Sequence, residues 1–252
     1  MSNNNLFDND WLENTYPEDS WAKAVVDDNG NYGSVYLDTL SAWFGKLPGS
    51  NKQKNSLKAG LLSCINDAHL GAVNELSWWI YLTSRGLSLD GIPKGATATP
   101  DFELKSDKGN IIFEVTTINP SREIGCGDLE YSQFNSLRRI VGKASEEGKL
   151  KQFIYGVERG MPVVLVLFNY DEFSGFGTQF HRMLRDNMVD CALPKELSAV
   201  IFLERSVDKG KSRYKKDSAF VFRNPKAEYS FKTGLIEPLL SSDNDWLPCE
   251  QV

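Results

Sequence analysis

Two spacings of apolar residues run along the chain, one typical of helices and one typical of strands. Residues 54–85 have helical spacing and predict two helices, with Gly60 near their junction and Gly86 as the glycine that ends the second. Helical spacing returns over residues 129–155 and 176–190. Apolar runs bounded by turn residues predict strands at 101–105, 111–118, 162–168, 199–204 and 218–222.

The order of these elements predicts an α/β fold, in which a central mixed β-sheet is flanked by helices. The helix between the strands at 162–168 and 199–204 would make a crossover, so these strands should be parallel. The strand at 218–222 should pair with 199–204 across a basic loop at 209–216. The predicted parts are an N-terminal extension with one or two short helices (1–53), the domain (54–240) and an acidic C-terminal tail (241–252).

The first two predicted strands should form a hairpin closed by the turn Ser106–Gly109. Its register can be chosen by burial, because a one-residue slip would turn the apolar residues of one strand to the wrong face. In the chosen register Leu104 lies opposite Ile111, and Phe102 lies opposite Phe113. All large apolar residues of the first strand then have apolar partners.

The same register sets Asp101 opposite Glu114, and two like charges at this place should destabilise the sheet. A cation between them would remove the repulsion, and oxygen ligands completed by water and phosphate suit Mg²⁺ or Mn²⁺. Replacing either carboxylate by Ala should then leave stability unchanged or raise it. The alternative is that Asp101 splays into solvent and that Glu114 is an exposed residue.

Glu75 is a third candidate carboxylate, on the second predicted helix. The apolar residues of its helical face are Ala72, Trp78, Trp79 and Leu82. A glutamate in such surroundings needs a partner, and a metal ion or a lysine would serve. Two alternatives remain open: a Glu75 whose carboxylate reaches solvent, and a Glu75 bound to Arg85.

Pro100-Asp101, followed after the turn by Glu114-Val115-Thr116, resembles the motif of the PD-(D/E)XK nuclease superfamily. The order of helix, hairpin, basic helix and apolar strand over residues 65–205 also resembles this superfamily. The resemblance implies a restriction-endonuclease-like core and metal-dependent hydrolysis of phosphodiester bonds. The chain departs from the motif at Thr116, because the hydroxyl of threonine cannot supply the positive charge of the motif lysine.

The resemblance implies that a lysine on the following helix replaces the motif lysine, and the candidates are Lys143, Lys149 and Lys151. Lys149 is the first choice, because Lys149 and Gln152 are spaced i, i+3, share a helix face and resemble the Lys-x-x-Gln pairing of related families. Lys151 is the second choice.

The resemblance also implies a role for each residue. The residues expected to hold Mg²⁺ or Mn²⁺ are Asp101, Glu114, Glu75 and, through its carbonyl, Val115. Lys149 or Lys151 would orient the attacking water and stabilise the developing anion, while Gln152 and Thr116 would position that water. The residues expected to contact the nucleic-acid backbone are Lys143, Lys211, Arg213 and Lys215.

Composition limits this hypothesis without excluding it. The 252 residues carry a net charge of −6, which opposes binding to a polyanion, yet basic residues cluster at 138–151 and 209–216. DNA is favoured over RNA as the partner, and a homodimer or larger complex is left open. Two histidines and four widely spaced cysteines argue against a histidine-rich or zinc site.

The longest apolar run, Met161–Phe168, is too short to span a bilayer, and the polar N-terminus does not resemble a signal peptide. A cytoplasmic protein without membrane association is therefore expected.

Two competing functions remain. Thr116 favours an inactive nucleic-acid- or protein-binding module on the same fold. A glycosidase would use the paired carboxylates, with Trp78 and Trp79 stacking on sugars.

Overall fold

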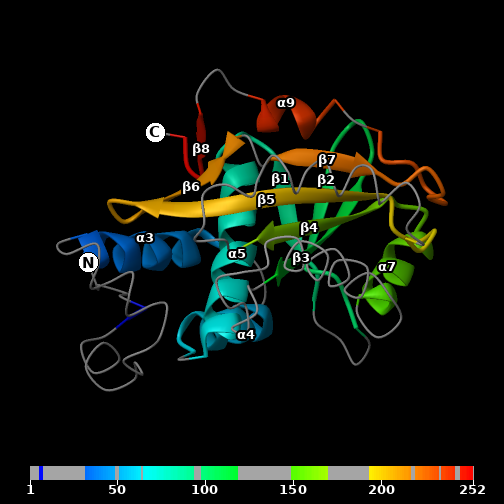
Figure 1. The fold of residues 1–252 in the computed structure, drawn as a ribbon. Coiled ribbons are helices and arrows are strands. Elements are labelled where there is room, and N and C mark those ends of the chain that lie inside the picture. The colour runs from blue at the N-terminus through cyan, green and yellow to red at the C-terminus, as the bar shows by residue number, and fades with distance from the viewer. Residues whose placement is uncertain are drawn as a thin grey trace, which may run out of the picture.

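A β-sheet of eight strands forms the centre of the described part of the protein. The computed structural model describes residues 6–7, 32–48, 51–63, 65–93, 98–118, 149–169, 193–216, 219–232, 234–241 and 245–251. The helices are α3 (Tyr32–Lys46), α4 (Asn51–Leu61), α5 (Asn66–Thr83), α7 (Leu150–Val157) and α9 (Glu237–Leu240). The strands are β1 (Ser88–Gly91), β2 (Phe102–Lys105), β3 (Ile111–Ile118), β4 (Val163–Asn169), β5 (Ala199–Asp208), β6 (Lys211–Lys215), β7 (Phe220–Arg223) and β8 (Trp246–Pro248) (Figure 1).

The sheet is mixed and mostly antiparallel. Its strand order is β1-β2-β3-β4-β5-β6-β8, and β7 pairs with β5. The pairs β3–β4 and β4–β5 are parallel, the second as the crossover predicted, and the other neighbours are antiparallel. This arrangement confirms a mixed α/β architecture. Among the described helices, none is both long and apolar enough to cross a membrane.

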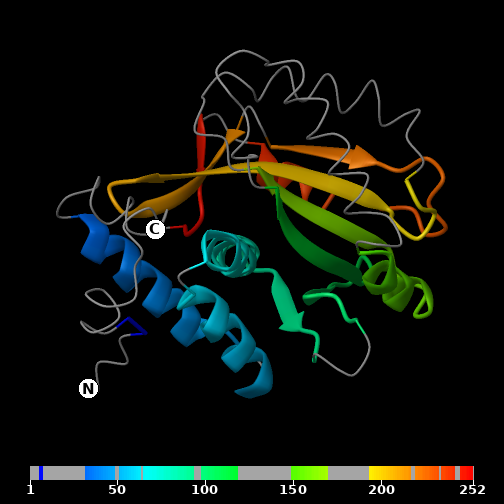
Figure 2. The same cartoon turned by 60° about the horizontal axis from the view of Figure 1, so that its bottom comes forward.

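Helix α5 lies between the sheet on one side and α3 and α4 on the other (Figure 2). Buried apolar residues surround it on nearly all sides, as expected for a helix enclosed by two layers. The ring of Trp78 stacks on Tyr81 at 5.8 Å between centroids and meets Phe113 edge-on at 5.7 Å. Trp79 is buried as well. Neither tryptophan is available to a sugar, so the glycosidase alternative loses its basis.

Helix α7 packs on the opposite face of the sheet, where Phe153 is buried with Ile112. Helix and sheet approach closely at Gly156. A Cβ atom at this residue would lie 2.3 Å from Cγ2 of Val163 and 3.3 Å from Cγ1 of Ile112. The glycine therefore allows α7 to lie directly against β3 and β4.

The predicted register of the hairpin is confirmed. Leu104 pairs with Ile111 and Phe102 pairs with Phe113, and all four side chains are buried. Gly109 has a φ of 116° in the turn, a conformation that glycine adopts without strain. The hairpin is extended on its outer side by β1, which pairs with β2. Alternation of apolar residues was thus sufficient to fix this part of the sheet.

The basic segment predicted as a loop is mostly a strand. Lys209 and Gly210 form a tight turn with φ values of 49° and 75°, and β6 returns along β5 with Ser212 and Tyr214 buried. The loop prediction was wrong because the basic residues around and between Ser212 and Tyr214 obscured their alternation. The last predicted strand exists as β7 and pairs with β5, as expected.

Segments predicted outside the domain take part in its structure. Tyr36, Leu40 and Trp43 of α3 belong to the main core. Strand β8 pairs with β6, so the C-terminal segment adds to the sheet instead of forming a tail.

Residues 119–148 and 170–192 lie outside the described residues. The predicted helix at 176–190, most of the one at 129–155, and Lys143 are therefore not described.

His69 is buried beneath α3 and α4. Its Nδ1 lies 2.8 Å from the carbonyl oxygen of Leu61, and its Nε2 lies 3.3 Å from the hydroxyl of Tyr36. Burial, reinforced by the charge of Arg205, lowers the pKa of His69 from 6.5 to about 4. Between these values the unfolded chain binds a proton that the folded chain does not bind. Stability is therefore lost as the pH falls through this window.

The native protein should lose about 2 kcal/mol of unfolding free energy through His69 when the pH falls from neutral to about 5. We expect His69→Gln to abolish this contribution. The measurement is urea unfolding of both proteins across this range. Carboxylates titrate alike in both proteins, so subtracting the two profiles isolates His69. Identical profiles would contradict a neutral, buried His69.

Candidate active site at the hairpin

Asp101 lies just before β2, at the end of the hairpin ladder. Its backbone N–H donates to the carbonyl of Phe113 at 3.1 Å. Asp101 is only 7% exposed, and its Oδ2 accepts a hydrogen bond from the N–H of Val115 at 2.8 Å. Asp101 therefore ties the start of β2 to the middle of β3, and the alternative in which it splays into solvent is wrong.

Glu114 lies on the face of β3 that points toward α7. Its side chain is 2% exposed, and Nζ of Lys149 donates to Oε1 at 2.5 Å. The alternative of an exposed Glu114 is therefore wrong. A cation does lie beside this carboxylate, but it is an ammonium of the protein itself. The argument that a metal ion must relieve the repulsion between Asp101 and Glu114 no longer follows, nor does the expected neutral or favourable effect of removing either side chain.

Lys149 directly precedes α7, and its side chain is 26% exposed. The interaction with Glu114 joins residues 35 positions apart in the sequence. Lys151, the second choice for the replacement lysine, is exposed on α7. Of the two candidates within the described residues, the structure thus brings Lys149 to the motif carboxylate.

Gln152 lies one turn beyond Lys149, and its backbone N–H donates to the carbonyl of Lys149 at 2.9 Å. Its Oε1 is buried and accepts no hydrogen bond from the part of the chain that the structure describes. A buried amide oxygen normally has a donor, so this atom suits a bound water. Thr116 is buried two residues beyond Glu114 on the same face of β3.

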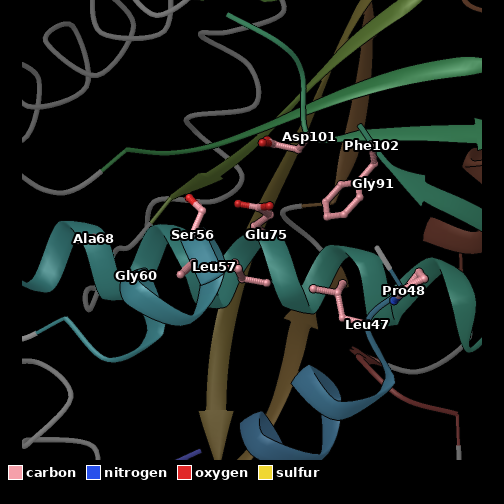
Figure 3. A pocket seen from close by; sticks show the side chains of 11 residues that line it. Leu47, Pro48, Ser56, Leu57, Gly60, Ala68, Glu75, Gly91, Asp101 and Phe102 are labelled. Carbon is pink, nitrogen blue, oxygen red and sulfur yellow. The ribbon is translucent and has the colours of Figure 1, made fainter. Parts of the chain in front are cut away.

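Glu75 and Asp101 line one pocket of about 200 Å³ between α4, α5 and the start of β2. Figure 3 shows both carboxylates on the same side of this pocket. Glu75 is partly exposed. Arg85 donates to the carbonyls of Tyr81 at 2.8 Å and Pro248 at 2.7 Å. The alternative of a Glu75–Arg85 pair is therefore wrong.

A buried hydrogen-bond chain, absent from the sequence-based prediction, joins the elements that carry Glu75 and Glu114. Nε of Arg205 donates to Oδ1 of Asn74 at 2.9 Å, and Nδ2 of Asn74 donates to Oγ1 of Thr117 at 2.9 Å. These hydrogen bonds fix α5 against the end of β3. Arg205 has no neighbouring motif in the sequence, so only its burial identifies it.

Comparison of the chain with known protein families, curated proteins and solved structures finds no match. The chemistry must therefore be inferred from the residues of the hairpin, α5 and α7 themselves.

The candidate metal ligands do not form a closed cage. Within the described ranges no group of three or more His, Cys, Asp or Glu residues lies close enough together to hold a metal ion. Asp101 and Glu75 share a pocket, whereas Glu114 contacts Lys149 toward α7. Carboxylate and carbonyl oxygens are ligand types that Mg²⁺ accepts, and Mg²⁺ needs only one or two carboxylates because it keeps several waters.

The basic residues of β6 have acidic and aromatic neighbours. Nη2 of Arg213 lies 3.2 Å from Oδ2 of Asp208, and its guanidinium lies 4.2 Å from the ring centroid of Trp246. Nζ of Lys215 lies 3.9 Å from Oε1 of Glu204. Lys211 is exposed. Three of the four residues expected to contact nucleic acid thus lie on β6, and carboxylates neighbour two of them.

Proposed function

We propose that this protein is a metal-dependent nuclease that hydrolyses phosphodiester bonds, with DNA favoured over RNA. The observation that carries the proposal is the contact between Lys149 and the buried Glu114. It supplies the positive charge that Thr116 lacks, beside the carboxylate that the motif requires. The superfamily resemblance and the mixed sheet support the same conclusion, and the restriction-endonuclease-like topology is part of the proposal.

Asp101, Glu114 and the carbonyl of Val115 would hold Mg²⁺ or Mn²⁺, with Glu75 extending the site through water. Such an ion neutralises phosphate charge and lowers the pKa of a bound water. The N–H of Val115 holds the Asp101 carboxylate in a fixed orientation before substrate arrives. A preorganised ligand needs little rearrangement during the reaction, which favours catalysis.

Lys149 would orient the attacking water and stabilise the negative charge that develops on the phosphate. The Glu114 carboxylate at 2.5 Å holds the ammonium in place. Oε1 of Gln152 would accept a hydrogen bond from the same water, and the hydroxyl of Thr116 would help to position it.

The cations of β6 would contact the nucleic-acid backbone and add affinity without sequence choice. Lys211 is exposed, whereas Arg213 and Lys215 lie near carboxylates. A phosphate would have to compete with Asp208 and Glu204 for these two side chains. Binding should therefore be weak at physiological salt and fall steeply as salt rises.

A non-catalytic module that binds nucleic acid or protein is the second candidate. The observation that favours it is the ion pair itself, because Lys149 occupies the Glu114 oxygen at 2.5 Å. On this alternative the pair is a structural element, and the metal ion is not required.

The deciding experiment incubates the protein with plasmid, single-stranded DNA and RNA in Mg²⁺, Mn²⁺ or EDTA. Cleavage that requires either metal, together with a metal-induced rise in melting temperature, is the expected result. Failure to cut any substrate, combined with an unchanged melting temperature, would favour the non-catalytic module.

A further inference from the structure

One face of the sheet carries Glu114 and continues onto the hairpin of β5 and β6. Glu114 pairs with Leu165 of β4, and Leu165 pairs with Val200 of β5. Leu165 and Val200 belong to the apolar cluster on the side of α7. Because side chains alternate along a strand, Glu204 and Asp208 of β5 lie on the same side as Val200. These two carboxylates therefore share a face of the sheet with Glu114.

The basic side chains of β6 lie on this face as well. Ser212 and Tyr214 are buried, and Tyr214 belongs to the core cluster on the other face. The cations of β6 that therefore point to the side of Glu114 are Lys211, Arg213 and Lys215. Their ion pairs with carboxylates of β5 agree with this placement. We call these three residues the cation row.

The cation row lies to one side of the candidate active site. The hairpin of β5 and β6 extends past the ends of β3 and β4 (Figure 1). Lys215 neighbours Glu204, four residues along β5 from the level of Glu114. Lys211 pairs with Asp208, four residues farther. With about 3.3 Å per residue and about 4.8 Å between strands, the row lies roughly 20 to 30 Å from Glu114.

The hairpin is basic within an acidic chain. Residues 204–216 carry six basic and two acidic side chains, whereas the whole chain has a net charge of −6. Lys211 is exposed, and the guanidinium of Arg213 lies against the ring of Trp246. A ligand must compete with the carboxylates of β5 for these cations. Duplex DNA carries one charge per about 1.7 Å of its axis, twice the density of one strand, so a duplex competes better than a single strand.

We propose that the cation row binds duplex DNA on one side of the phosphodiester that is cleaved. The inference rests on the proposed nuclease function, because Glu114 defines the place of the cut. At about 3.4 Å per base pair, a separation of roughly 20 to 30 Å corresponds to about six to nine base pairs. The substrate is therefore a duplex that extends at least this far on one side of the cut.

Cut positions on a long linear duplex, labelled at one end of each strand in turn, test the proposal. A cut near an end leaves the cation row without phosphates. In Mg²⁺ the native protein should therefore cut about tenfold less often within about six to nine nucleotides of one end of each strand. This protected end should have the same polarity, 5′ or 3′, on both strands, and the other end should show a shorter protected zone.

Binding of the duplex in EDTA, measured by anisotropy over a range of salt concentrations, gives a readout without cleavage. We expect Lys211→Gln/Arg213→Gln to reduce the slope of log affinity against log salt by about two, since each phosphate contact contributes about 0.9. Lys211→Gln alone changes only an exposed side chain and should reduce the slope by about one. It keeps the test valid if the double variant does not fold.

Lys108→Gln is the matched control. Lys108 is exposed in the turn before β3, at the opposite end of this strand from the cation row, so its replacement should leave the slope unchanged. Protected zones of equal length, or a slope in Lys211→Gln equal to that in Lys108→Gln, overturn the proposal and leave metal-dependent cleavage untouched. A lowered slope without cleavage in any metal supports the cation row as a DNA surface and contradicts the nuclease.

Discussion

Replacing Glu114 by Gln is expected to lower the rate of metal-dependent DNA cleavage on the order of a thousandfold. Gln keeps the shape of the side chain but removes its charge. The candidate metal site loses an anionic ligand, and Lys149 loses the carboxylate that holds it at 2.5 Å. Both losses act on the transition state, so kcat should fall more than KM rises. The measurement is the rate of plasmid cleavage across a range of substrate concentrations.

Glu103→Gln is the matched control on the neighbouring strand. Glu103 is half-buried, and its Oε1 accepts a hydrogen bond from Nδ2 of Asn110 at 2.8 Å. Its replacement should change the cleavage rate by less than about threefold, since the amide oxygen of Gln can accept the same hydrogen bond from Asn110. A Glu114→Gln rate close to that of Glu103→Gln would falsify the catalytic role of Glu114.

Replacing Lys149 by Met is expected to destabilise the protein by about 3 kcal/mol. Glu114 is 2% exposed, so its carboxylate depends on the ammonium to offset the loss of hydration. Lys149 is 26% exposed, which lets water reach the site and places the effect at the lower end for a broken buried pair. Urea unfolding at neutral pH measures the difference.

The double variant Glu114→Gln/Lys149→Met should recover most of the lost stability, because it removes both charges together. Lys151→Met is the control, since Lys151 is exposed on the same helix and should change stability by less than about 0.5 kcal/mol. Additive single and double effects would show that Glu114 and Lys149 do not interact, and the candidate site would then lose its central contact.

The hairpin shows how far a sequence pattern can lead. Burial of Phe102 and Leu104 selects one register, and the structure has that register. The pattern failed at β6, because only Ser212 and Tyr214 indicate its inward face among basic residues. It also failed at the chain ends, where α3 and β8 join the core and the sheet through contacts distant in sequence.

The candidate site divides in the same way. Asp101 and Glu114 could be chosen from the hairpin alone, because strand alternation is local. The reason for choosing them was partly wrong, because the prediction assumed two carboxylates without other partners. In the structure Asp101 accepts a hydrogen bond from the N–H of Val115, and Glu114 pairs with Lys149. Hydrogen bonds to the backbone of a neighbouring strand and ion pairs with a later helix leave no mark in a strand pattern.

The sequence by itself determined the hairpin, its register and the residues that carry acidic groups, because period-two alternation and burial act between near neighbours. Tertiary structure decided which lysine meets Glu114. Lys149 reaches it across 35 positions because α7 packs closely on β3 and β4 at Gly156. Tertiary structure also brought Glu75 and Asp101 to one pocket, through the packing of α5 under the sheet. Both contacts depend on how separate elements pack, and that packing is set by the whole core at once.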